Sequence, residues 1–200
     1  MSQPLRTESS PLRVNLGCGR NFLEGWVNLD WKALPGVDVV ADLNACATTP
    51  LPFDDGQVDE FLLSHVIEHI PNALALMQEL HRVARPGAIA CIRVPYGNSD
   101  DAWEDPTHVR PYFPGSFGYF SQPYYWRADY GYRGDWLTRD VTLHIPASNA
   151  RGASIEVLYE RLHRERNLVV EMVAMLEAVK PIRAAQRELQ VVAPTWISVA

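Results

Sequence analysis

The feature that most constrains the fold is a series of short apolar segments, most of which end at glycine, aspartate or serine. These segments span residues 12–16, 26–30, 37–41, 58–64 and 88–94. Their length and composition are typical of β-strands, and strands that alternate with helices or crossovers form parallel sheets covered on both faces. We therefore predict an α/β fold with a doubly wound, mostly parallel sheet.

Two helices are predicted among and after these strands. Apolar residues recur at helical spacing over residues 72–85, between Pro71, a suitable first helical residue, and Pro86, which ends the helix. A second apolar stripe predicts a helix over residues 154–180. Its second half, residues 169–176, is apolar nearly all round, so we expect it to be buried or to support a homodimer.

Residues 96–149 contain most of the aromatic residues of the chain and show no clear periodicity before a predicted strand at residues 136–143. A long irregular stretch inside a compact domain is usually functional or disordered, and this aromatic composition argues against disorder. We interpret it as an insertion after the fifth strand, either a substrate lid or a satellite core. The whole chain, 1–200, is assigned to one domain with a loose tail at residues 1–11.

The overall charge excludes some functions. The net charge is −6 over 200 residues, and the pI is about 5.5, so the chain has no electrostatic footprint for nucleic acid or anionic lipid. The N-terminal residues are polar and predict neither a signal peptide nor a membrane span. Cys18, Cys46 and Cys91 are odd in number and widely spaced, which favours free thiols in a reducing compartment. We expect a cytoplasmic protein.

A ligand site is expected at one edge of the predicted sheet. In parallel sheets of this kind the ligand lies beyond the carboxyl ends of the strands, where Gly17, Asp30, Asp42 and His65 are placed. Two cofactors use a strand followed by a glycine turn and an acidic residue: nicotinamide dinucleotides and S-adenosylmethionine. Phe22 occupies the third glycine position of the dinucleotide fingerprint, which disfavours the dinucleotide without excluding it.

Six blocks of residues, in this order, resemble the Rossmann-like (class I) S-adenosylmethionine-dependent methyltransferases. They are Val14-Asn15-Leu16-Gly17-Cys18-Gly19, Gly25-Trp26-Val27-Asn28-Leu29-Asp30, Val39-Val40-Ala41-Asp42-Leu43, Leu51-Pro52-Phe53-Asp54-Asp55-Gly56, Ser64-His65-Val66-Ile67-Glu68-His69 and Leu80-His81-Arg82-Val83-Ala84-Arg85-Pro86-Gly87. The resemblance covers about residues 12–95 and implies S-adenosyl-L-methionine as the cofactor.

The resemblance also implies residue roles. Gly17 and Gly19 would contact the methionine part of the cofactor and Asp30 its ribose. The other implied contacts are Asp42 and Leu43 beside adenine, His65 at the exit of the fourth strand, Trp31 after Asp30, and Asn15 and Asn21 in the glycine turn. Asn15 replaces the usual acidic residue and Asn21 the usual third glycine, and asparagine tolerates the left-handed backbone that such turns need.

The segment Ser64-His65-Val66-Ile67-Glu68-His69-Ile70-Pro71 contains H-x-x-E-H, the spacing of a zinc-peptidase signature. That signature needs a helix that points both histidines at one ion. Here a predicted strand precedes it and Pro71 follows, so a helix over both histidines would be about one turn long. The segment is interpreted as the exit of the fourth strand, and no metal is expected.

Methyl transfer from a sulfonium is an in-line displacement, for which a protein aligns the acceptor, excludes water and sometimes removes a proton. The candidates for these tasks are Asp105, His108 and Arg110, with His108 as base or substrate ligand; the alternative is that they tie the insertion down. The acidic pI favours a small-molecule or glycan acceptor. A nicotinamide oxidoreductase and a non-catalytic cofactor-binding or scaffold protein remain alternatives.

Overall fold

The structure is a computed structural model that describes residues 10–200, so the predicted tail lies almost wholly outside it. The strands are β1 Arg13–Leu16, β2 Val27–Asp30, β3 Val39–Val40, β4 Val58–Ser64, β5 Ala84–Pro95, β6 Trp136–Ile145, β7 Glu171–Ala178 and β8 Thr195–Val199. The helices are α1 Ala73–Val83, α2 Asp101–Glu104, α3 Ala147–Ala150 and α4 Ile155–Leu162. Short 3-10 segments are η1 Leu43–Ala45, η2 Ile67–His69, η3 Pro114–Phe120, η4 Gln122–Trp126 and η5 Arg187–Leu189.

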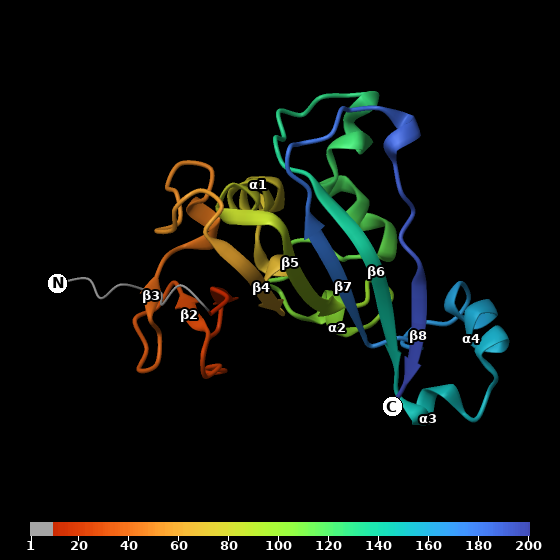
Figure 1. The fold of residues 1–200 in the computed structure, drawn as a ribbon. Helices are drawn as coiled ribbons and strands as arrows, with labels where there is room; N and C mark the ends of the chain where they lie inside the picture. The colour runs from red at the N-terminus through yellow and green to blue at the C-terminus, as the bar shows by residue number, and fades with distance from the viewer. Residues whose placement is uncertain (1–9) are drawn as a thin grey trace.

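All eight strands form one sheet in the order β3-β2-β1-β4-β5-β7-β6-β8 (Figure 1). β1 pairs in parallel with β2 and β4, β2 with β3, and β4 with β5. The antiparallel pairs join β7 to β5 and to β6, and β8 returns parallel to β6. The predicted α/β class with a mostly parallel, Rossmann-like sheet is confirmed.

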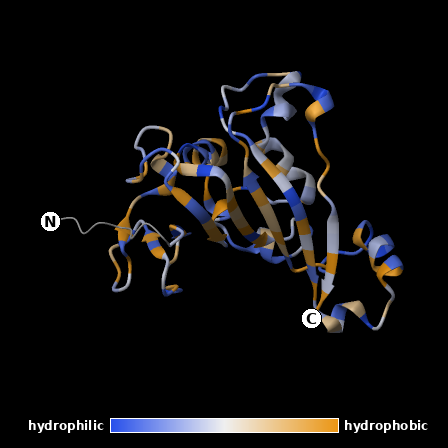
Figure 2. Cartoon of the chain, in the orientation of Figure 1, coloured by the Kyte–Doolittle hydropathy of each residue, from blue (hydrophilic) through white to orange (hydrophobic). Residues whose placement is uncertain are grey.

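The core lies on one face of this sheet, under α1 and η3. Every second side chain is buried along β7, along β4 from Phe61 and along β5 from Ala88 to Val94. Figure 2 shows the apolar residues of these central strands. The apolar face of α1 meets these side chains, because Leu76, Met77 and Leu80 have no exposed surface. Trp136 at the start of β6 is also fully buried and donates its indole N–H to Met77 O at 2.9 Å.

The opposite face of the sheet is covered more lightly than a doubly wound sheet implies. Side chains such as Leu62, Cys91 and Met175 are only half-buried there, between the ion pairs Arg93–Glu171 and Arg139–Glu177. In the described part of the chain the connection from β1 to β2 contains turns and no helix. The short connection explains the light cover, because a helix of several turns does not fit into it.

The predicted helix over residues 154–180 is wrong in its second half. The helix α4 ends at Leu162, and the apolar stretch that follows forms β7 in the middle of the sheet. A short run that is apolar on both faces carries no periodicity that distinguishes strand from helix, and the β-branched Val169, Val170 and Val173 favour strand. Because this segment is a central strand, it offers no helical surface for the proposed homodimer.

The predicted insertion contributes both to the sheet and to the core. Its last part is β6, and five buried aromatic side chains before it join the main hydrophobic cluster: Tyr112, Phe117, Phe120, Tyr125 and Tyr132. Other aromatic residues of the stretch are exposed, among them Trp103, Tyr119 and Tyr130. The buried set fits the interpretation as core, and a lid function for the exposed set stays a prediction.

A buried carboxylate connects this insertion to the C-terminal part of the chain. Asp135 is fully buried and accepts hydrogen bonds from Gln122 N at 3.2 Å, from Arg183 N at 3.0 Å and from the Arg183 guanidinium at 2.7 and 2.8 Å. The side chain of Arg183 also donates to Ser121 Oγ at 3.0 Å. The ion pair between Asp135 and Arg183 thus ties the segment around Ser121 and Gln122 to the C-terminal part of the chain.

We expect Asp135→Ala to lower the free energy of unfolding by about 3 kcal/mol, because it leaves the largely buried Arg183 without its counter-ion. Asp129→Ala is the matched control: Asp129 pairs with Arg133 at 2.8 Å on the exposed surface, where such pairs contribute little. Urea denaturation followed by circular dichroism measures both. Equal effects for the two variants would contradict the importance given to Asp135.

Candidate cofactor site and its family

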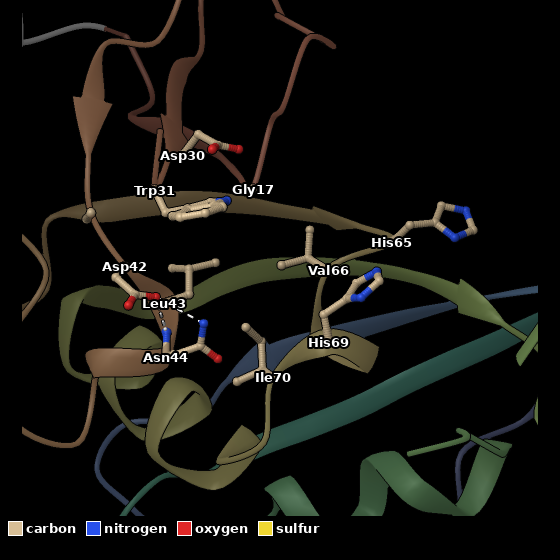
Figure 3. Close-up of a pocket in the computed structure, with 11 residues that line it drawn as sticks. Gly17, Asp30, Trp31, Asp42, Leu43, Asn44, His65, Val66, His69 and Ile70 are labelled. Atoms are coloured by element: carbon tan, nitrogen blue, oxygen red, sulfur yellow. Dashed lines mark hydrogen bonds between the residues drawn. The ribbon is translucent and has the colours of Figure 1, made fainter. Parts of the chain in front are cut away.

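A cavity of about 210 Å³ opens at the carboxyl ends of β1, β2 and β4 (Figure 3). Its lining residues are Gly17, Asp30, Trp31, Ala41, Asp42, Leu43, Asn44, His65, Val66, His69 and Ile70. Six of the predicted cofactor residues, Gly17, Asp30, Trp31, Asp42, Leu43 and His65, are therefore brought together. Ligand pockets are usually larger, roughly 300 Å³ or more, so this cavity matches part of a cofactor such as its nucleoside.

The glycine turn forms one wall of the cavity. Gly17 has φ +60°, and a Cβ on it would lie 2.7 Å from Cγ2 of Val66. Only glycine satisfies both the left-handed backbone and this close approach. The turn is closed by Gly19 N, which donates to Asp30 Oδ2 at 2.9 Å, so the first strand end is held against the second.

Asp30 is the carboxylate at the centre of the site. It is 6% exposed, and its second oxygen accepts a hydrogen bond from Lys32 N at 2.9 Å. A carboxylate oxygen has more than one lone pair, so each oxygen can accept a further hydrogen bond after these backbone amides are satisfied. Two such acceptors, fixed by backbone donors, suit a pair of neighbouring hydroxyl groups.

The far end of the cavity has an apolar and aromatic wall. Leu43 is buried, whereas Trp31 is 65% exposed and lies above Leu43 in Figure 3. Asp42 Oδ1 caps the short segment η1 by accepting from Asn44 N at 2.9 Å and Asn44 Nδ2 at 3.0 Å. An exposed indole facing a leucine offers a flat slot for a planar ring, with polar groups at its rim.

His65 marks the exit of β4 and has the uncommon left-handed backbone, with φ +56°. Its Nε2 lies 2.9 Å from Glu171 Oε1, and Glu171 also accepts from Arg93 at 2.8 Å. The carboxylate of Glu68, opposed by burial and assisted by Glu171, raises the pKa of His65. The interpretation of this segment as the exit of the fourth strand agrees with the structure, because only a 3-10 turn follows.

Three predicted cofactor residues, Asn15, Gly19 and Asn21, do not line the cavity. Asn15 Nδ2 donates to Asn21 O at 2.9 Å and to Asn28 Oδ1 at 3.0 Å. Asn28 in turn accepts from Leu23 N at 2.9 Å. Together these bonds hold the loop between β1 and β2, so Asn15 and Asn21 support the glycine turn. Contact of Asn15, Gly19 or Asn21 with a cofactor stays a prediction.

The predicted catalytic residues lie beside the cavity without lining it. The His108 ring centre is 4.7 Å from that of His69, which does line the cavity. Val109 N donates to Glu68 O at 2.8 Å, which holds the loop against η2. Asp105 Oδ2 is 3.9 Å from His108 Nε2, whereas the guanidinium of Arg110 stacks over Tyr112 at 5.1 Å.

Five lining residues were not predicted: Ala41, Asn44, Val66, His69 and Ile70. Three of them, Ala41, Asn44 and Val66, directly adjoin predicted residues, so extending the predicted set by one position finds them, whereas Ile70 follows His69. His69 is the informative one, because the sequence places it in the H-x-x-E-H segment. The H-x-x-E-H spacing draws attention to His69, although the zinc-peptidase interpretation of that spacing is rejected.

The comparison with known families agrees with this site. Residues 14–92 match a family described as a methyltransferase domain, and this range contains every residue that lines the cavity. The matched part of the chain, residues 14–92, is a methyltransferase domain. The predicted family and its cofactor, S-adenosyl-L-methionine, are thereby confirmed.

Relatives of this methyltransferase domain are similar in part or in fold. An uncharacterized methyltransferase from Mycobacterium sp. (strain KMS) is 50% identical over 63 residues, which are 32% of this chain and 25% of that protein. The match thus spans about a quarter of the curated relative's length. A SAM-dependent methyltransferase from Archaeoglobus fulgidus has a TM-score of 0.60 at 18% identity, over 84% of this chain and 86% of that one.

A second solved structure of similar fold is a SAM-dependent methyltransferase from Aquifex aeolicus. It has a TM-score of 0.50 at 17% identity, over 83% of this chain and 81% of that one. At such identities the two solved structures show a shared fold. None of the helices in the described part of the chain has the length and apolar character needed to cross a bilayer.

We expect Gly17→Ala to weaken binding of S-adenosylhomocysteine by more than about tenfold, which corresponds to about 1.4 kcal/mol. The added Cβ either shifts the turn or pushes Val66 into the cavity. Gly152→Ala is the control, because Gly152 has φ +70° and no atom near a Cβ; it imposes the same backbone strain away from the site. Isothermal titration calorimetry measures both. Unchanged affinity in folded Gly17→Ala protein would contradict the placement of the ligand.

Proposed function

We propose that this protein transfers the methyl group of S-adenosylmethionine to a small-molecule or glycan acceptor. The observation that carries the proposal is the single cavity in which Gly17, Asp30 and Asp42 meet at the ends of parallel strands. A glycine backbone for the amino-acid part, paired acceptors for ribose hydroxyls and a slot for adenine match the parts of this cofactor in order. These contacts need no diphosphate site.

The nicotinamide alternative finds less support. A dinucleotide places its pyrophosphate at the N-terminus of the helix that follows the glycine turn, where the helix dipole favours negative charge. In the described chain the stretch after Gly17 contains turns only before β2 begins at Val27. The structure offers no such helix end beside the cavity, so a ligand without phosphates fits better.

The acceptor side of the site is assigned to the loop that contains Asp105, His108 and Arg110. In this proposal the acceptor approaches past His65 and His69, which lie on the opposite side of the cavity from Asp42 in Figure 3. His108, adjacent to His69, binds the acceptor or accepts its proton, and Asp105 positions His108 across 3.9 Å. Displacement then transfers the methyl carbon from sulfur to the acceptor, with S-adenosylhomocysteine as the product.

The acceptor class and the compartment are parts of the same proposal. A net charge of −6 disfavours polyanionic acceptors such as nucleic acid. Exposed aromatic residues near the loop, including Trp103 and Phe113, suit contacts with sugar rings or small organic molecules. Cys18, Cys46 and Cys91 are free, which supports a reducing compartment, the cytoplasm.

The first test compares two ligands on the purified protein. Calorimetry is expected to detect binding of S-adenosylhomocysteine and not of NADH. Asp30→Asn should weaken the former by about tenfold or more, because hydrogen bonds to a charged group are the stronger ones. Asp38→Asn is the control, since Asp38 also accepts a backbone N–H, from Asn28 at 2.8 Å, outside the cavity lining. Binding of NADH alone would overturn the proposal.

The second test concerns turnover. A methyl-release assay with a panel of hydroxyl, amine and carboxylate small molecules and glycans is expected to identify an acceptor. On that acceptor, His108→Ala should lower kcat by about a hundredfold or more, with the affinity for S-adenosylhomocysteine unchanged. The control, His163→Ala, replaces an exposed histidine at the end of α4. Full turnover in His108→Ala protein would remove His108 from the mechanism.

A further inference from the structure

Glu68, His69 and His108 form a three-residue cluster beside the cofactor cavity. Each offers one ligand atom, and the three atoms lie within 4.8 Å of one another. Glu68 and His69 come from η2, whereas His108 comes from the loop that follows α2. The backbone bond from Val109 N to Glu68 O, 2.8 Å long, holds the two segments together.

The carboxylate of Glu68 is the unusual member of the cluster. The residue is only 2% exposed, and neither carboxylate oxygen has a hydrogen-bond partner in the described residues. Glu68 Oε1 lies 3.4 Å from His65 Nδ1, an ion pair when His65 is protonated, without the alignment of a hydrogen bond. Burial of an ionised carboxylate without hydrogen bonds is strongly unfavourable. A further positive group beside Glu68 would therefore stabilise the site.

The two histidines present nitrogen atoms that are free to bind a cation. Thr107 Oγ1 lies 2.6 Å from Asp105 Oδ1 and 2.9 Å from His69 Nδ1. Because the carboxylate can only accept, the hydroxyl of Thr107 donates to Asp105, and its oxygen accepts a hydrogen bond from His69 Nδ1–H. The remaining nitrogen of His69, Nε2, then carries the lone pair. Such a carboxylate-linked contact is how metal-binding histidines are commonly oriented.

His108 supplies the third donor. Its side chain is 8% exposed, and its Nδ1 is buried without a hydrogen-bond partner among the described residues. An imidazole nitrogen in this position is an unsatisfied polar atom like the oxygens of Glu68. Unsatisfied atoms of two buried side chains in one small cluster are rare in native structures, and one shared ligand would satisfy them together.

We propose that Glu68, His69 and His108 bind one divalent transition-metal cation of the zinc class. Two imidazoles and one carboxylate are a donor set that zinc and neighbouring metals accept. The donor atoms must close inward by side-chain rotation, since metal–ligand bonds of about 2.0–2.2 Å are shorter than the present spacing allows. Three protein ligands leave a position for an exchangeable oxygen.

This site differs from the zinc signature that the sequence suggests. In H-x-x-E-H the ligands would be His65 and His69 on one helix. Here His65 is engaged by Glu171 at 2.9 Å, no α-helix spans the motif, and the second histidine ligand is His108 from a distant loop. The same letters thus contribute Glu68 and His69, and the third ligand comes from the tertiary fold.

The open coordination position would face the acceptor side of the cavity, because His69 lines it. A cation there would hold an acceptor oxygen and lower the pKa of its hydroxyl proton. This part rests on the proposed methyl transfer, and it narrows the acceptor class to compounds with a hydroxyl or carboxylate oxygen. His108 would then act as a metal ligand and not as a free base.

The test uses untagged full-length protein, stripped with a chelator, dialysed against buffer with zinc chloride and analysed by plasma mass spectrometry and calorimetry. We expect about one zinc ion per chain. Glu68→Gln, which keeps the shape of the side chain, and His108→Ala should weaken zinc binding by at least about tenfold. His163→Ala and Glu104→Gln, exposed residues outside the cluster, should leave it unchanged.

Absence of bound zinc, or equal binding in the cluster variants and the controls, would overturn the proposal. Should a variant fail to fold, cobalt(II) added to the wild-type protein decides: intense visible absorption that zinc abolishes supports the site, and the weak spectrum of the hydrated ion refutes it. Calorimetry with S-adenosylhomocysteine on the stripped protein tests the cofactor site separately, so zinc binding and cofactor binding can fail independently.

Discussion

The parallel register of β1 with β2 and β4 is the constraint on which the site depends. Leu16 pairs with Leu29 on one side and with Leu63 on the other, so the chain leaves all three strands at the same level. Side chains far apart in the sequence then face one cavity, and no long loop is needed to gather them. The pairing is stabilised by burial, since Leu16, Leu29 and Leu63 are nearly inaccessible to solvent. Burial of these leucines within the strands therefore determines the geometry of the cavity at the strands' carboxyl ends.

The first half of the chain could be predicted because its signals are local. A glycine that must adopt positive φ and an aspartate that closes a turn each specify backbone geometry within a few residues, as Gly17 and Asp30 do. The second half could not be predicted in this way. The stretch that forms β7 is apolar on both sides, so its pattern does not reveal that it inserts antiparallel between β5 and β6. Likewise, the approach of His108 to His69 depends on how the loop packs.

Antiparallel β7 also contributes to the chemistry at the edge of the sheet. Its first residue, Glu171, pairs in register with Pro95 at the end of β5 and reaches both Arg93 and His65. The carboxylate of Glu171 balances the positive charge of Arg93 and contacts His65, whose backbone is left-handed. A helix over this stretch, as the apolar stripe suggested, would have removed that carboxylate from the site. The misassigned segment thus supplies one of the contacts that fixes the exit of β4.

Unfavourable features concentrate within a few residues of that exit. His65 has positive φ, Gly17 leaves no room for a Cβ beside Val66, and Glu68 buries a carboxylate without hydrogen bonds. The positive φ of His65 and the buried carboxylate of Glu68 lower stability locally, and such features persist where surrounding structure over-determines them, commonly at functional sites. In the proposed complex the cofactor lies against the Gly17 turn and the exit of β4, which gives the first two features a function. It does not account for Glu68, which lies outside the cavity lining. A second ligand beside the first explains why the strained backbone and the buried charge occur together.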